Sequence, residues 1–156
     1  MSNWKQQLTE MMPLLGHRNW IVITDSAYPL QTNPGITTLY APEDFDTVLS
    51  TVNNIVRNAH HVTPHVWLDA EQKALDEALC PGWNGYKESV EGILGGENAP
   101  QYLGHEEIIG RLDEMSRLFK VVIVKTSLAI PYTSVFFELD CGYWDAERER
   151  AMRSRL

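Results

Sequence analysis

The chain has few cysteines, no long hydrophobic run and no excess of positive charge, and each of these absences excludes a class of protein. Its two cysteines, Cys80 and Cys141, show neither the spacing of metal ligands nor that of a disulfide framework. No apolar run approaches the roughly 20 residues that are needed to span a bilayer. The formal net charge is −8 over 156 residues. Because this charge repels phosphate backbones, we expect no nucleic acid and no membrane as a partner.

The composition predicts a folded protein of the cytoplasm. The N-terminus carries Lys5 and Glu10 and has no small-residue cleavage site, so we expect no signal peptide. A chain with so few cysteines suits a reducing compartment. Apolar residues make up 44% and charged residues 22% of the chain, which is typical of a globular protein. We therefore expect one domain over residues 1–156.

The hydrophobic pattern alternates between helical and strand-like segments, which indicates an α/β fold. Apolar spacing predicts helices over 4–15, 42–58, 70–79 and 105–119, and short apolar runs predict strands over 20–24, 36–40, 65–68, 121–124 and 135–139. Residues 83–100 are rich in glycine and weakly periodic, and we expect a surface excursion that contains a helix there. The alternation predicts a three-layer sandwich, with a mostly parallel or mixed sheet and helices on both of its faces.

The C-terminal residues from about 144 to 156 are charged nearly throughout. Glu149 and Arg153 stand four residues apart and support a helix on its surface. Such a helix buries little, and a helix this polar needs help from elsewhere to be stable. We expect a terminal appendage or an assembly contact.

The histidines near the middle of the chain suggest a metal site, which is the first of three candidate chemistries. His60, His61 and His65 are followed by Asp69, and imidazoles with a carboxylate suit zinc. Adjacent histidines point to different sides of either a helix or a strand, so histidines that bind no metal are the favoured interpretation. Asp69 has a second interpretation, because its spacing to Gln72 resembles a capping box. The predicted site residues include no metal ligand.

The second candidate chemistry is nucleophilic catalysis by a thiol. Neither Cys80 nor Cys141 lies in a recognisable nucleophile turn or has a histidine placed beside it by the sequence. A buried structural thiol is the commoner role of such a residue. We expect both to be structural.

The third candidate chemistry is acid–base work by groups at the ends of strands. In the stretch LLGHRNWIVITDSAYP, residues 14–29, His17 precedes an apolar strand and Asp25 follows it. If the loops fold back, the two side chains could converge on one small polar ligand. The alternative is that His17 caps a helix and Asp25 is an ordinary turn residue. His105 and Tyr132 also lie at element ends, where open α/β sheets gather ligand groups. Without a redox motif or phosphate loop, this set suits a neutral polyol and needs no cofactor.

Two of these motifs resemble one known family. LGHRNWIVITDSAYP looks like the N-terminal signature of the D-ribose pyranase and L-fucose mutarotase family, and VVIVKTSLAIPYTSVFFELDCG is similar to its C-terminal motif. The resemblance covers most of the chain and is weakest from about residue 83 to 104. It implies that His17 is the general acid or base and that Tyr132 is a second proton-transfer or binding group. It also implies that Asp25 and His105 contact the sugar.

The resemblance further implies a ring-shaped homo-oligomer, a pentamer or decamer, with sites at the subunit seams. We expect the strand that carries Tyr132 to complete the pocket of a neighbour that supplies His17 and Asp25. Ser134 stands where the family usually has asparagine and is expected to line the pocket. Leu128 replaces a residue that is usually a carboxylate.

The predicted function is interconversion of the cyclic forms of a monosaccharide, ribose-like or fucose-like, by acid–base ring opening. A non-catalytic sugar-binding or regulatory protein of the same fold is the alternative, because the changes at Leu128 and Ser134 are consistent with lost chemistry. A metal-dependent hydrolase built on the histidines near His60 is a third class.

Overall fold

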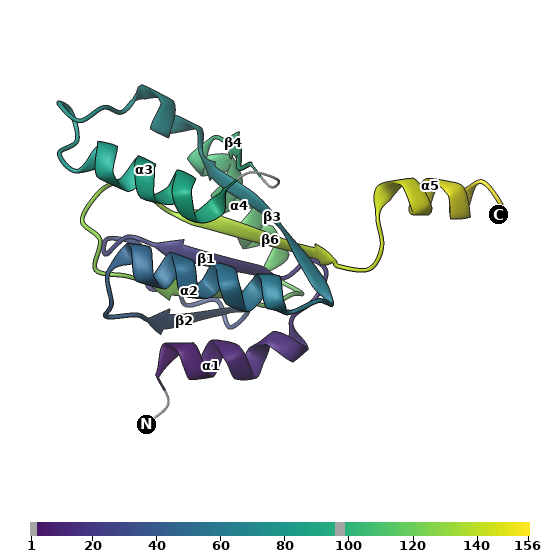
Figure 1. The fold of residues 1–156 in the computed structure, drawn as a ribbon. Coiled ribbons are helices and arrows are strands. Elements are labelled where there is room, and N and C mark those ends of the chain that lie inside the picture. The colour runs from purple at the N-terminus through teal and green to yellow at the C-terminus, as the bar shows by residue number, and fades with distance from the viewer. Residues whose placement is uncertain (1–2, 96–98) are drawn as a thin grey trace.

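A mixed six-stranded sheet forms the centre of the computed structural model, which describes residues 3–95 and 99–156. The strands are β1 (Trp20–Thr24), β2 (Ile36–Tyr40), β3 (Val62–Asp69), β4 (Gln101–Leu103), β5 (Val121–Lys125) and β6 (Val135–Cys141), in the order β2-β5-β1-β6-β3-β4. β6 pairs antiparallel with both β1 and β3, whereas all other pairings are parallel. The amino end of β6 therefore lies beside the carboxyl ends of its two neighbours (Figure 1).

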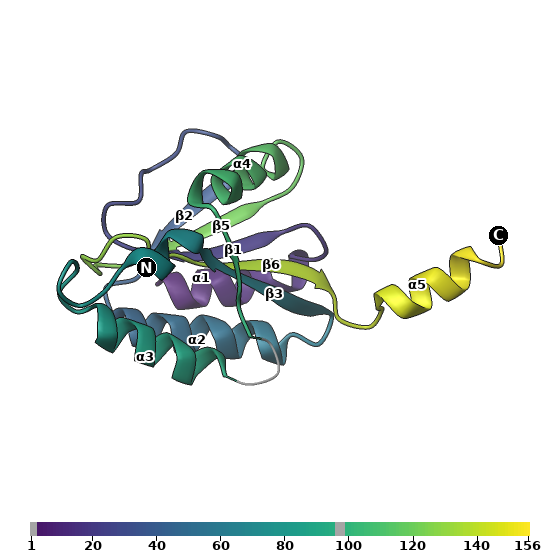
Figure 2. The same ribbon diagram turned by 90° about the horizontal axis from the view of Figure 1, so that it is seen from above.

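Helices cover both faces of this sheet, which confirms the predicted three-layer sandwich. The helices are α1 (Trp4–Met11), α2 (Phe45–Asn58), α3 (Trp83–Leu94), α4 (His105–Met115) and α5 (Ala146–Arg153). One core joins α1, α2 and α3 to the face that carries Ile21 and Ile23 of β1. The other core joins Ile108 of α4 to the face that carries Val22 (Figure 2). Successive strand side chains point to opposite faces, so a strand that is buried on both sides must be apolar throughout.

The buried stripe of α3 corrects the expectation of a surface excursion after residue 83. Trp83, Tyr86, Val90 and Leu94 follow one helical face and are all buried. That face belongs to the same core as α1 and α2. Glycines at 85 and 92 lower the helix propensity and weaken the sequence pattern, but burial of two large aromatic rings compensates.

The expected helix over 70–79 is wrong, and so is the capping box that Asp69 and Gln72 suggested. Only a 3₁₀ segment forms, η2 (Ala70–Ala74), and the Asp69 side chain does not cap it. The carboxylate is engaged with His105 instead. The segment therefore lacks the stabilisation that a side-chain cap would give its first turn.

The C-terminal helix α5 stands clear of the rest of the molecule in both views (Figures 1 and 2). None of its residues is buried. Its side-chain contacts are local: Asp145 caps the helix at the Arg148 amide, and Arg153 pairs with Glu149. Within residues 3–95 and 99–156, no helix has the length and apolarity to cross a membrane.

Candidate functional site

A cavity of about 410 Å³ opens where the antiparallel strand β6 meets its parallel neighbours. Asp25 follows β1 and Asp69 ends β3, so both reach the cavity from carboxyl ends of strands. Tyr132 and Ser134 precede β6, and His105 begins α4. A change of strand direction opens a crevice at the edge of a sheet, which is where α/β folds bind ligands. The volume lies within the range of small-molecule sites.

The cavity brings together four of the predicted site residues but excludes the fifth. Asp25, His105, Tyr132 and Ser134 line it. His17 lies at the opposite end of β1, where its Nδ1 is 2.9 Å from Asp140 Oδ1. Strand β1 has five residues, at about 3.3 Å each, and an imidazole cannot reach along it. The hypothesis that His17 and Asp25 converge within one chain is therefore wrong.

The position of Asp25 also corrects the expected division of the site between subunits. Asp25 and Tyr132 line one cavity of one chain, so Tyr132 does not have to come from a neighbour to meet Asp25. The loops that carry them are tied together, because the Ser26 amide donates to the Leu128 carbonyl at 2.8 Å. Among the predicted site residues, only His17 is left on another surface.

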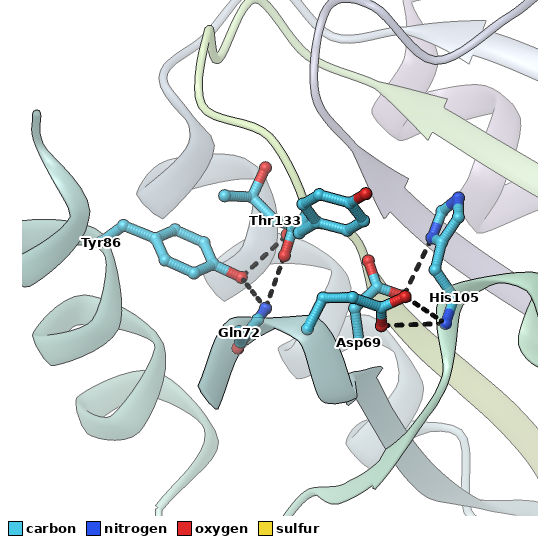
Figure 3. A network of polar contacts seen from close by, with 7 residues as sticks. Asp69, Gln72, Tyr86, His105 and Thr133 are labelled. Atoms are coloured by element: carbon cyan, nitrogen blue, oxygen red, sulfur yellow. Dashed lines mark hydrogen bonds and ion pairs between the residues drawn. The ribbon is translucent and has the colours of Figure 1, made fainter. Parts of the chain in front are cut away.

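Asp69 is the functional candidate that the sequence interpretation missed. It is fully buried, and its Oδ1 lies 3.0 Å from Nδ1 of His105 (Figure 3). Its Oδ2 has no hydrogen-bond partner within the described part of the chain. Burial raises the pKa of Asp69 to about 6, although the hydrogen bond and charge of His105 oppose the shift. The available signal was its place directly after a strand, as for Asp25.

Tyr132 is held in a strained backbone conformation by two buried side chains. Its φ is +57°, which a residue with a Cβ rarely adopts. Gln72 Nε2 donates to the Tyr132 carbonyl at 2.7 Å, and the Tyr86 hydroxyl donates to the Thr133 carbonyl at 2.8 Å (Figure 3). The Tyr132 ring meets the His105 ring edge to face, with centroids 5.7 Å apart. The turn thus presents the phenol beside the imidazole.

Burial disfavours the charged forms of two further groups that line the cavity. Burial raises the pKa of Asp25, against a hydrogen bond from the Tyr28 amide and the charge of Lys125. Burial also raises the pKa of Tyr28 to about 12, with help from the nearby carboxylates. Ser134 is 4% exposed and adds a hydroxyl to the lining. The site therefore combines carboxyl, phenol, hydroxyl and imidazole groups, which can exchange protons and hydrogen-bond a polyol.

A second carboxylate–histidine cluster occupies the opposite end of the sheet. Asp140 contacts His17 through one oxygen and His65 through the other, at 2.9 and 3.0 Å. All three side chains are about half exposed. Burial acts to raise the pKa of Asp140, but hydrogen bonds from His65 and the Cys141 amide, with the histidine charges, lower it overall. This cluster lies on a surface and not in the cavity.

The candidate metal ligands are dispersed. His61 Nε2 contacts the carbonyl oxygens of Met12 and Leu15, at 3.1 and 2.8 Å. His65 pairs with Asp140 and Asp69 pairs with His105, while His60 is exposed. The metal-dependent hydrolase interpretation thus loses the ligand set on which it depended. Cys80 is buried and Cys141 half-buried, and both are free thiols.

The fold matches solved structures of two proteins in complex with sugars and of a third protein, FucU. RbsD of Bacillus subtilis, in complex with D-ribose, is 21% identical with a TM-score of 0.62, over 90% of this chain and 95% of that chain. The fucose mutarotase of Streptococcus pneumoniae, in complex with L-fucose, is 15% identical with a TM-score of 0.58, over 86% and 91%. FucU from Bifidobacterium longum is 12% identical with a TM-score of 0.58, over 86% and 92%.

At these identities the likeness establishes a shared fold, as the resemblance of the two terminal motifs predicted. No family model and no curated protein matches the chain. The chemistry of this chain has to be argued from its own residues.

Proposed function

We propose that this protein is an isomerase of the mutarotase or pyranase kind, which interconverts the cyclic forms of a monosaccharide. The observation that carries the proposal is the convergence of Asp25, His105, Tyr132 and Ser134 on one cavity at the carboxyl ends of the strands. Proteins with the same fold bind D-ribose and L-fucose. A pentose or deoxyhexose is therefore the substrate class that we propose.

Ring opening of a cyclic sugar sets the chemical demand on the site. The anomeric hydroxyl must lose a proton while the ring oxygen gains one. The bond between the anomeric carbon and the ring oxygen then breaks, and the anomeric carbon becomes an aldehyde. Two groups of opposite protonation state have to face one edge of the sugar. Asp25 and Ser134 are the proposed partners of the sugar hydroxyls, and Tyr132 is the proposed group beside the reacting edge. The spontaneous reaction is already accessible, so each 1.36 kcal/mol of barrier lowering gives a tenfold gain.

His17 enters the proposal through a neighbouring copy of the chain. Its side chain is 59% exposed, and its Nδ1 contacts Asp140. In a ring-shaped homo-oligomer each subunit presents two different surfaces to its neighbours, so the His17 end of one chain can meet the cavity of the next. In the proposed pentamer or decamer, this imidazole reaches the cavity of the neighbouring chain and is the second proton-transfer group.

Saturation-transfer NMR on a panel of aldoses tests the proposal directly. We expect accelerated exchange between ring forms or anomers for at least one pentose or deoxyhexose, and loss of that acceleration in His17→Ala with the fold intact. Circular dichroism of the variant is the control for folding. Sugar binding without acceleration across the panel would instead establish a sugar-binding protein. The apolar Leu128, which packs against the core, and the short Ser134 are the observations that favour this alternative.

A further inference from the structure

The buried carboxylate of Asp69 takes no part in the function proposed so far, although it lies in the cavity. It contacts His105 through one oxygen, and the other oxygen has no partner among the residues that the structure describes. Burying a carboxylate with only one hydrogen bond is costly. A carboxylate in this state depends on the imidazole for its stability, which couples the protonation of the two groups.

The contact with Asp69 decides which nitrogen of His105 faces the cavity. An ionised carboxylate only accepts hydrogen bonds, so Nδ1 has to carry the hydrogen and Nε2 has to keep its lone pair. Figure 3 shows the far ring nitrogen of His105 pointing away from the carboxylate. The His105 amide donates to both oxygens of Glu71, at 3.0 and 3.2 Å, and the Tyr132 ring packs against the imidazole. Backbone and ring are thus both fixed.

We propose that Asp69 is a positioning residue that makes His105 the general base of the ring opening. This inference rests on the proposed function. His105 Nε2 takes the proton of the anomeric hydroxyl, the electron pair left on that oxygen forms the aldehyde C=O, and the bond from the anomeric carbon to the ring oxygen breaks. The ring oxygen takes a proton from protonated His17 of the neighbouring chain. Ring closure in the reverse sense returns both protons.

The groups around the pair define the pH at which the base is available. Six titratable groups surround the Asp69–His105 pair. They are Asp25 and Tyr28 after β1, Glu71 of η2, Tyr86 of α3, Glu106 of α4, and Tyr132 before β6. The charges of Glu71 and Asp25 add to burial in raising the pKa of Asp69 to about 6. Asp69 should therefore be ionised, and able to fix the tautomer of His105, above about pH 6.

The test compares Asp69→Asn with wild type, and Asp113→Asn is the matched control. An asparagine keeps the shape of the side chain but can donate to Nδ1, which would place the hydrogen on Nε2 and remove the base. Asp113→Asn removes the same charge, but from an exposed site on α4. We measure the exchange rate of the preferred sugar against pH, the sugar affinity, and the imidazole ¹⁵N shifts of His105, assigned with His105→Gln.

For Asp69→Asn we expect a rate lower by about 100-fold or more, as for other histidines held in the wrong tautomer, with sugar affinity within about threefold. The acidic limb of the pH–rate profile should also be lost, and the ¹⁵N shifts should report hydrogen on Nε2. Asp113→Asn should keep the wild-type rate and profile. An unchanged rate, profile and tautomer in Asp69→Asn would overturn the inference. Wild type that accelerates no sugar would overturn the proposed function instead, while the ¹⁵N shifts would still decide whether Asp69 sets the tautomer.

Discussion

The two ends of the sheet each carry a carboxylate–histidine contact. The two contacts are nearly equal in length, but one is buried and the other is exposed to solvent. Asp69 and His105 are 3.0 Å apart in the cavity, and Asp140 and His17 are 2.9 Å apart on the surface beyond the other end. Asp69 is fully buried, and its pKa is raised. Asp140 is 42% exposed, and its pKa is lowered. Equal hydrogen-bond geometry thus gives opposite proton affinities, because loss of solvation dominates at one end and the histidines dominate at the other.

This difference suits the two chemical roles that ring opening demands. Burial disfavours the charged form of Asp69, which couples it to its imidazole partner, whereas Asp140 favours its ionised form beside His17. The buried pair supplies the proposed base, and the exposed pair supplies the proposed acid from a neighbouring chain. Each prediction below breaks one of the two contacts or tests whether they meet.

The largest expected effect comes from mixing two inactive proteins. His17→Ala and Tyr132→Phe damage opposite ends of the sheet, so neither should accelerate sugar exchange alone. Rings co-assembled from equal amounts should regain roughly one quarter of the wild-type activity. Each seam needs an intact His17 from one chain and an intact Tyr132 from the next, and each is intact with a probability of about one half. The measurement is the exchange rate of verified mixed rings. Lack of any regain would mean that His17 does not complete the cavity of a neighbouring chain.

Removing the buried charge should produce the next largest effect, and it should stabilise the protein. The folded-state pKa of Asp69, about 6, lies above its ordinary value of 3.8. The contribution of Asp69 to the stability of the wild type is therefore fully present below about pH 4 and is lost as the pH rises through 6. Asp69→Asn has no such loss. The free energy of unfolding of the variant, relative to wild type, should therefore rise by about 2 to 3 kcal/mol between pH 4 and pH 7.5.

Urea unfolding at pH 4, 5.5 and 7.5 measures this change, and Asp113→Asn is again the matched control. A difference between Asp69→Asn and wild type that does not change with pH would show that Asp69 is not titrating in this range. A gain in stability with a loss of activity is the usual sign of a functional group that is kept at a cost.

The smallest expected effect belongs to Asp140→Asn at the exposed end. The pKa of Asp140 is lowered, so its contribution is present above the ordinary carboxyl pKa of 3.8 and is lost as the pH falls through the lowered value. As a dissociated single chain, the variant should be less stable than wild type at pH 6, by less than about 1 kcal/mol, because exposed ion pairs are screened. The difference should disappear in acid and shrink in high salt. A loss of several kcal/mol in the assembled protein would mean that the assembly buries Asp140.

Much of the fold followed from local patterns in the sequence. The apolar run 20–24 and the runs that became β2, β5 and β6 were predicted nearly to the residue. Strands buried on both faces need continuous apolar sequence, and that pattern is visible without tertiary information. The failures occurred where tertiary contacts override weak sequence signals. The burial of α3 was hidden by its glycines, the three-residue strand β4 was not predicted, and the helix after Asp69 is only a short 3₁₀ segment.

The site divides in the same way, for a physical reason. The sequence by itself determined which side chains stand at element ends, and four of them, Asp25, His105, Tyr132 and Ser134, share one cavity. Only the tertiary structure decided that His17 lies at the far end of β1. It also decided that Asp69 contacts His105, which lies 36 positions later in the chain. Residue type and spacing fix which groups can titrate, but solvation and the direction of β6 fix where they meet and how tightly each holds its proton.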